Sequence, residues 1–439
     1  MNWTDVGHPI GRCALELSCI LWPLSMRWKS WTRLPTLSLA IALAACGGGG
    51  SSSSTPAPPG GQLTIAGQNV MPIVLDQGPP GAVGVFNVPY VSVTLCRPGT
   101  SVCQTLDHII VDTGSYGLRI ITASLFDPAL ALPLSSAPGG NPTGECGQFF
   151  SGYLWGAVRR ADVHLGGDVA SSLPIQIGGD TDPRFATVPT ACASLGANVG
   201  SVAAFGGNGV LGIGVFNQDC GAACVTQAVP ATYYACSNAG CAASTMPLAS
   251  QVANPVAALG ANNNGAVVQL PAVPTGGVSS LSGSLVLGID TQANNQLGSV
   301  AVYKADNVGN FSTTYRGTTL TASFIDSGSN VLYFIDAGLP RCPVSTLFYC
   351  PPSALTLSAA VSSTVNNTSG TINFTIEAVP WDTRPQANVV AVSVGAQLAF
   401  AGHTQSFDWG LPFFFGRPVA IGIEGKTSTN HGSGPFWAW

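Results

Sequence analysis

The chain has 439 residues, enough for two domains of ordinary size. Only 8% of the residues are charged while 46% are apolar, and Gly (54) and Pro (32) are abundant, which favours short strands and turns over long amphipathic helices. The net charge of −5 without a basic run in the β-rich region argues against nucleic acid as a partner.

An export signal is expected at the N-terminus. Residues 26–33 are basic, residues 34–45 are apolar but too short to span a bilayer, and the run ends in Leu-Ala-Ala before Cys46. This order resembles a bacterial lipobox, which implies that Cys46 is lipidated and becomes the mature N-terminus. A signal starting at Met26 has normal length, so residues 1–45 are read as a signal region whose true start is Met26. The alternative is an apolar stretch that ends in Cys by chance.

Residues 46–61 combine the lipidated Cys with a flexible linker of Gly, Ser, Thr, Pro and Ala. Residue 47 is Gly and not Asp, and by the same resemblance this implies anchoring in the outer membrane of the cell envelope.

Cysteine usage agrees with export. Three of the 13 cysteines lie at or before Cys46, and the even number that remains indicates disulfides in an oxidising compartment. Short spacings favour three pairs, without fixing the connectivity: Cys96–Cys103, Cys236–Cys241 and Cys342–Cys350. A rival interpretation is a zinc site made of Cys220, Cys224, Cys236 and Cys241, but exported thiols would oxidise, and we expect no metal and no cofactor.

Two β-rich halves follow the linker, an N-terminal lobe at 62–277 and a C-terminal lobe at 278–439. Residues 88–95 alternate apolar and polar side chains, and residues 106–111 form a second strand that leads into Asp112. In the second half, residues 283–290 and 320–325 are predicted strands, and the latter delivers Asp326. A Gly-rich GNGVLG segment at 207–212 fits a dinucleotide-binding pattern, but the residues after it do not begin a helix.

Each half carries the same motif at the end of a strand: IIVDTGS at 109–115 and SFIDSGS at 323–329. A buried Asp needs hydrogen-bond donors around it, and a following Gly brings backbone N–H groups close to the carboxylate. If the two turns face each other, both carboxyls share one site and cannot both ionise, so an acid and a base coexist. The predicted catalytic pair is Asp112 and Asp326, supported by Thr113, Gly114, Ser115, Ser327, Gly328 and Ser329.

The paired motifs resemble those of the pepsin-like aspartic peptidases. This resemblance implies an all-β, two-lobed fold with a cleft between the lobes. It also implies an apolar-apolar-Gly segment late in each lobe, matched here by residues 210–212 and 414–416, and a flap over the substrate, matched by FFSGYLWG at 149–156 with Phe149, Phe150 and Tyr153. The chain departs from the family at Phe149, where a Tyr is usual, and at Arg119, where an aromatic residue is usual.

The expected function is that of an envelope-anchored aspartic endopeptidase, a monomer that hydrolyses extended polypeptides without a cofactor. The alternative is an inactive lipoprotein of the same fold that binds peptides or acts as a scaffold. A third, weaker option is a β-sandwich lipoprotein in which both Asp-Gly turns are merely structural.

Overall fold

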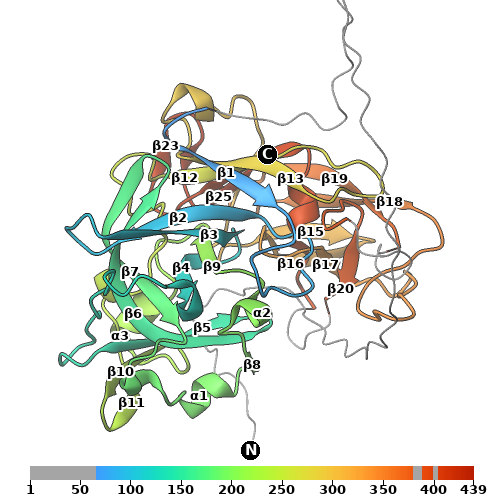
Figure 1. Ribbon diagram of the computed structural model, residues 1–439. Helices are drawn as coiled ribbons and strands as arrows, with labels where there is room; N and C mark the ends of the chain where they lie inside the picture. Colours follow the sequence, from blue (N-terminus) through green and yellow to red (C-terminus); the bar gives the residue numbers. More distant parts are fainter. Residues whose placement is uncertain (1–65, 379–387, 399–403) are drawn as a thin grey trace, which may run out of the picture.

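The computed structural model describes residues 66–378, 388–398 and 404–439, and in these ranges the protein is mainly β-strand with a few very short helices (Figure 1). The all-β prediction is therefore confirmed. The expected signal region, the linker and Cys46 lie outside the described residues. None of the helices in the described ranges is long and apolar enough to cross a membrane.

Two main sheets build the molecule. The larger has sixteen strands in the described part of the chain and contains most of the N-terminal half. In chain order these strands are β1 (Val70–Leu75), β2 (Tyr90–Cys96), β3 (Cys103–Asp112), β4 (Tyr116–Ile121), β5 (Thr143–Phe149), β6 (Gly152–Leu165), β7 (Asp168–Gly178), β8 (Ala197–Asn198), β9 (Gly209–Ile213), β10 (Tyr233–Ser237), β11 (Gly240–Ala243), β12 (Gly265–Leu270), β13 (Leu281–Leu287), β14 (Val302–Lys304), β22 (Arg417–Gly422) and β25 (Phe436–Ala438).

The second sheet has seven strands and lies entirely in the C-terminal half. It contains β15 (Phe311–Tyr315), β16 (Thr318–Ile325), β17 (Leu332–Phe334), β18 (Leu355–Ser362), β19 (Ser369–Ile376), β20 (Gly395–Gln397) and β21 (Asp408–Trp409); β23 (Thr427–Ser428) and β24 (Gly432–Ser433) form a separate ladder. The helices are α1 (Thr190–Ala193), α2 (Val202–Phe205) and α3 (Ala222–Thr226), with single 3₁₀ turns η1 (Thr122–Ser124), η2 (Pro183–Phe185), η3 (Leu248–Ser250), η4 (Ala293–Asn295) and η5 (Leu411–Phe414).

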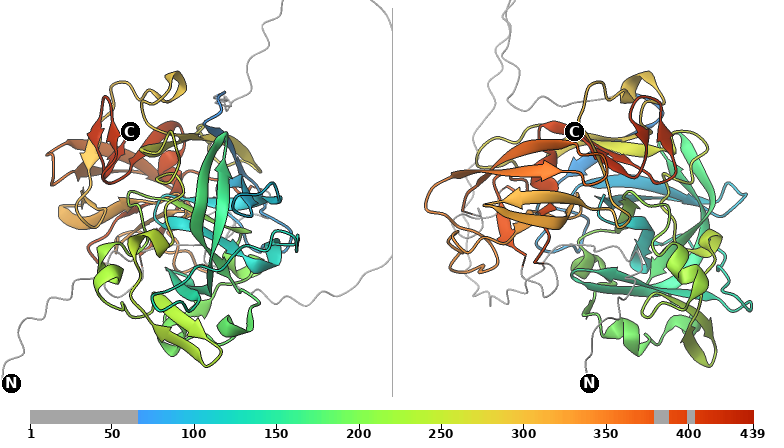
Figure 2. Two further views of the ribbon diagram at one scale, coloured as in Figure 1. Left: turned by 90° about the vertical axis from the view of Figure 1, so that its left-hand side faces the viewer. Right: turned by 180° about the vertical axis from the view of Figure 1, so that it is seen from behind.

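The two halves form two lobes joined by strands of the larger sheet. In Figure 1 the blue-to-green strands of the N-terminal half lie on the left and the orange strands of the second sheet on the right, and the view from behind in Figure 2 shows the same division with the sides exchanged. β1 pairs with both β2 and β13, and β12 pairs with β13 and β22. Strands from the start, middle and end of the chain therefore share hydrogen bonds between the lobes, which fixes one lobe against the other.

The burial of β3 explains how Asp112 comes to lie inside the protein. The first half of β3 alternates between exposed and buried residues, as expected for a strand with one face in water, whereas its last four residues are all buried. At that end β3 pairs with β2 on one side and in parallel with β9 on the other. The strand therefore passes from the surface of the lobe into its core and ends there with a carboxyl group.

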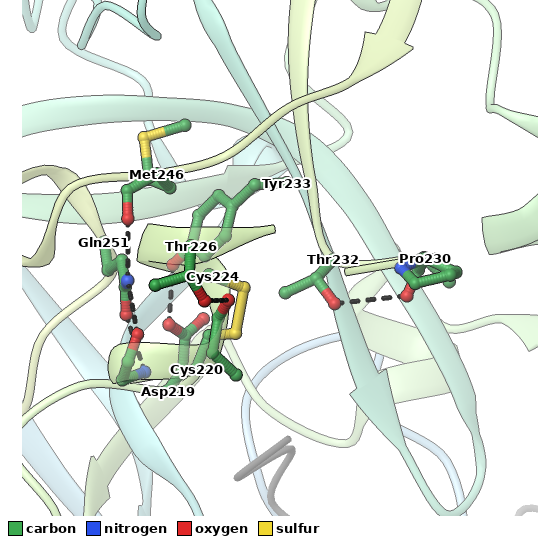
Figure 3. Close-up of a disulfide and its surroundings, with 12 residues drawn as sticks. Asp219, Cys220, Cys224, Thr226, Pro230, Thr232, Tyr233, Met246 and Gln251 are labelled. Carbon is green, nitrogen blue, oxygen red and sulfur yellow. Dashed lines mark hydrogen bonds between the residues drawn. A yellow bond between two sulfur atoms is a disulfide. The ribbon is translucent and has the colours of Figure 1, made fainter. Parts of the chain in front are cut away.

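All ten cysteines of the described residues form disulfides, and the three predicted pairs are confirmed. The other two pairs are Cys146–Cys192 and Cys220–Cys224. Figure 3 shows the second of these at α3, where the Gln251 side chain donates to the carbonyl of Met246. The zinc interpretation is wrong, because all four of its proposed ligands are disulfide-bonded.

Candidate active site

Asp112 and Asp326 occupy equivalent places in the two lobes. Asp112 is the last residue of β3, and Asp326 directly follows β16. β3 pairs in parallel with β9, and β16 pairs in parallel with β21. The two Asp-containing turns therefore emerge from the same kind of strand arrangement, one from each lobe.

The residues after the two Asp lock the turns together. The Thr113 N–H donates to Ser327 Oγ (3.1 Å), and the Ser327 N–H donates to Thr113 Oγ1 (2.9 Å). Each hydroxyl then donates across to a strand of the other lobe: Thr113 Oγ1 to the carbonyl of Ile325 (2.9 Å), and Ser327 Oγ to that of Val111 (2.7 Å). These four buried hydrogen bonds hold the turns face to face.

Glycine is required at the next position of each turn because a carboxyl group of the opposite lobe comes very close. A Cβ on Gly114 would lie 2.7 Å from Cγ of Asp326, and a Cβ on Gly328 would lie 2.8 Å from Cγ of Asp112. Each glycine N–H also donates to the Asp of its own turn, at 2.8 Å for Asp112 and 2.7 Å for Asp326. Glycine thus supplies both the space and the backbone donors that a buried carboxyl pair needs.

The two carboxyls form one electrostatic unit. They are 1% and 0% exposed, and a Cβ placed on Gly328 would lie 2.8 Å from Cγ of Asp112 and 3.1 Å from Oδ1 of Asp326, so both carboxyls border the same point. Burial raises the pKa of Asp326 well above its usual value, and the negative charge of Asp112 raises it further. Two buried carboxylates this close together cannot both be charged, so the pair holds one proton.

The outer serines of the two motifs differ. Ser329 Oγ donates to Oδ2 of Asp326 (2.8 Å), whereas Ser115 Oγ is buried and makes no hydrogen bond to any described residue. Five of the six predicted supporting residues therefore bond within the two turns, whereas in the described ranges Ser115 does not give Asp112 the hydroxyl bond that Ser329 gives Asp326.

The predicted flap is the hairpin of β5 and β6, whose turn runs from Phe149 to Gly152. Phe149 points into the N-terminal lobe and stacks edge-on against Phe205, with ring centroids 5.1 Å apart. Phe150 packs instead against a hydrophobic cluster of the C-terminal lobe that includes Tyr333 and Phe348. Tyr153 lies in a third cluster with Trp155 and the Cys146–Cys192 disulfide, so the three residues point to three different places.

Arg119, one of the two departures from the family pattern, holds the base of this hairpin. It is 3% exposed, and its Nη2 donates to Oε1 of Glu145 on β5 (2.8 Å) and to Oδ2 of Asp219 (3.2 Å). Tyr233 donates to the other oxygen of Asp219 (2.6 Å), in the region shown in Figure 3. Burial and the Glu145 charge raise the pKa of Asp219 well above its usual value, against the opposing effect of Arg119.

An inter-lobe contact that the sequence did not predict lies beside the site. Asn87, in the loop before β2, donates from Nδ2 to the carbonyls of Asn330 and Ala391 (2.8 Å each) and accepts from the Ala391 N–H (2.9 Å). A single Asn before a strand is too common a feature to indicate such a contact.

The first apolar-apolar-Gly landmark is confirmed, but the second was wrong. Residues 210–212 lie on β9 beside the end of β3. In the C-terminal lobe the equivalent segment is 408–410, because β21 pairs with the end of β16, while residues 414–416 lie at the end of the 3₁₀ turn η5 and just after it. The apolar-apolar-Gly pattern did not identify residues 408–410 because the first of the two apolar positions holds Asp408.

The chain belongs to a protein family: the model described as "Protein of unknown function (DUF3443)" matches residues 66–439. No curated protein matches the sequence. Among solved structures, the aspartic proteinase from Irpex lacteus is similar at 15% identity and a TM-score of 0.47, over 84% of this chain and 96% of that chain.

Proposed function

We propose that this protein is an aspartic endopeptidase that a lipid on Cys46 anchors to the bacterial outer membrane. The observation that carries the catalytic part is the burial of the Asp112 and Asp326 carboxyls on two facing turns, which reciprocal hydrogen bonds of Thr113 and Ser327 hold together. The anchor rests on the order of basic, apolar and Cys residues near the N-terminus.

The reaction follows from one proton shared by two carboxyls. Asp112 takes a proton from a water molecule as its oxygen attacks the peptide carbonyl carbon, while protonated Asp326 donates its proton to the carbonyl oxygen. The tetrahedral intermediate then collapses: its hydroxyl proton passes to Asp326, and the proton held by Asp112 passes to the leaving nitrogen. The C–N bond breaks, a carboxylic acid and an amine leave, and the starting protonation state is restored.

The hairpin of β5 and β6 supports an extended polypeptide as the substrate. Its turn reaches from the N-terminal lobe to the hydrophobic cluster around Tyr333, which also contains Val331, five residues after Asp326. A polypeptide entering there would lie as a strand beneath Phe149 and Phe150. We expect a monomer to suffice, because one chain carries both acids.

The second candidate is a peptide-binding module without turnover. It is favoured by the complete burial of both carboxyls and by the packing of Phe150 on the C-terminal lobe, which would have to open before a substrate could enter. The test is to incubate the full chain, purified in detergent, with a denatured protein across acidic and neutral pH, with and without a statine-type inhibitor. Inhibitor-sensitive cleavage is expected; binding of denatured protein without cleavage at any pH would favour the module.

A further inference from the structure

A third buried carboxyl, Asp408, lies next to the pair and has no part in the mechanism above. Asp408 is 0% exposed, and it lies on β21, opposite Phe324 of β16 and Tyr333 of β17. The equivalent residue of the N-terminal lobe is Val210, opposite Ile110. The C-terminal lobe thus places a carboxyl group where the other lobe has an apolar side chain.

No cation is available in the described surroundings to balance a charge on Asp408. β21, which carries Asp408, pairs with β16 and β17, and none of these three strands contains Lys, Arg or His. The charged groups that face it are the carboxyls of Asp112 and Asp326. The nearby Tyr333 hydroxyl donates to Oδ1 of Asn330.

These surroundings favour the neutral acid. Neither carboxyl oxygen of Asp408 makes a well-formed hydrogen bond to another described residue, and an isolated buried carboxylate is very costly. Burial raises the pKa of Asp408 well above its usual value; the nearby Ser329 hydroxyl lowers it and the Asp112 charge raises it. Burial is the largest of these effects, so the protonated form is favoured.

Ser329 connects this acid to the pair. Its hydroxyl donates to Oδ2 of Asp326 (2.8 Å), and its carbonyl accepts from the N–H of Leu411 (2.7 Å), three residues after Asp408. Protonated Asp408 can donate to Ser329 Oγ, which then has its own proton directed at Asp326. β21 also accepts a hydrogen bond from the Asp326 N–H through the Trp409 carbonyl (3.1 Å).

We propose that Asp408 is a protonated positioning residue that orients Asp326 through Ser329 and so distinguishes the two acids of the pair. The buried Ser115 hydroxyl has no hydrogen bond to Asp112, so this support exists on one side only. The effect on rate rests on the proposed peptidase function; the protonation of Asp408 and its link to Ser329 do not.

The first experiment measures proton uptake on folding. Above the unfolded-state carboxyl pKa of about 4, an unfolded chain has lost the Asp408 proton while the folded chain retains it, so stability falls as pH rises towards the folded pKa. For each unit of pH, the unfolding constant of the full chain should rise by a factor about tenfold larger than the factor for Asp408→Asn or Asp408→Val. Asp219 and Asp326 also make the unfolding constant rise with pH, and their contributions remain in both variants. If the unfolding constant of Asp408→Asn rose with pH as steeply as that of the wild-type protein, the proposal would be overturned.

The second experiment tests the link to Ser329 without activity. It is a double-mutant cycle of Ser329→Ala and Asp408→Val at acidic pH. The change in unfolding constant caused by Ser329→Ala should differ severalfold between the wild-type protein and the Asp408→Val variant. Additive effects would refute the link.

The third experiment separates positioning from structural support in the active enzyme. Asp408→Val should lower kcat with little change in KM, and Asp408→Asn, which retains a donor for Ser329, should recover most of the loss. Equal kcat losses in both variants would contradict the positioning role. A wild-type protein without peptidase activity would refute the proposed function, while the first two experiments would still decide the state of Asp408.

Discussion

Thr113 and Ser327, which are 214 residues apart in the chain, each donate a backbone N–H to the hydroxyl of the other. Each hydroxyl also donates to a carbonyl of the opposite lobe, and Trp409 Nε1 adds a further bond to Thr113 Oγ1 (3.1 Å). Two hydroxyl groups therefore hold Asp112 directly against Asp326, in addition to the strands that the lobes share.

Thr113→Val is expected to weaken this contact strongly. The change preserves shape but leaves the Ser327 N–H and the Trp409 indole without their acceptor, so the free energy of unfolding should fall by about 2–5 kcal/mol. Thr105→Val, on the exposed face of β3, is the matched control and should change stability by less than about 0.5 kcal/mol. Chemical denaturation measures the free energy of unfolding of both variants. An equal loss in the two would show that the reciprocal bonds of Thr113 do not stabilise the protein more than an exposed threonine does.

Arg119→Met should be among the most destabilising single changes in the N-terminal lobe. It leaves Glu145 and Asp219 buried without their cation, a loss of about 3–5 kcal/mol. Arg160→Met is a suitable comparison, because Arg160 donates to two carbonyls at the surface and its loss should cost less than about 1 kcal/mol. A thermal unfolding series checks this; a similar shift in both variants would argue against the ion cluster as a support of the flap.

The disulfides should differ in their contribution to stability. Cys146–Cys192 closes a segment of 46 residues and ties β5 to α1, whereas Cys96–Cys103 closes a segment of 7 within one hairpin. From loop-closure entropy, replacing the first pair by Ala should cost about 4 kcal/mol and the second about 2 kcal/mol. Denaturant titration of the two double variants under oxidising conditions tests the order, which the reverse result would contradict.

Much of the site could be predicted from the sequence because its motifs are local. Each Asp with its hydroxyl residue and Gly is contained in a few residues after an apolar strand, and both turns lie where the repeated pattern placed them. Three short-range disulfides could be predicted for the same reason. Cys146–Cys192 could not, because nothing in the sequence indicates which distant cysteine lies beside β5.

The residues of the site that the sequence did not predict contact residues that are far away in the chain. Asn87 contacts residues 243 and 304 positions away, and Asp408 reaches the site through strand pairing with β16. Asp408 was not predicted for a further reason. The apolar-apolar-Gly pattern requires an apolar residue at this position, and the protein has a buried acid there instead. The pattern therefore matched residues 414–416 and not residues 408–410.

The central claim is that Asp112 and Asp326 act jointly on one water molecule. Its most direct test is the cleavage rate of a denatured protein by three Asp→Asn variants at positions 112, 326 and 107, each shown to be folded by its unfolding transition. Asp107 lies on the exposed part of β3 and serves as the control. The account predicts that Asp107→Asn cleaves like the wild type, while Asp112→Asn and Asp326→Asn each lose at least about a thousandfold in rate. Full activity in either of these two variants would contradict it.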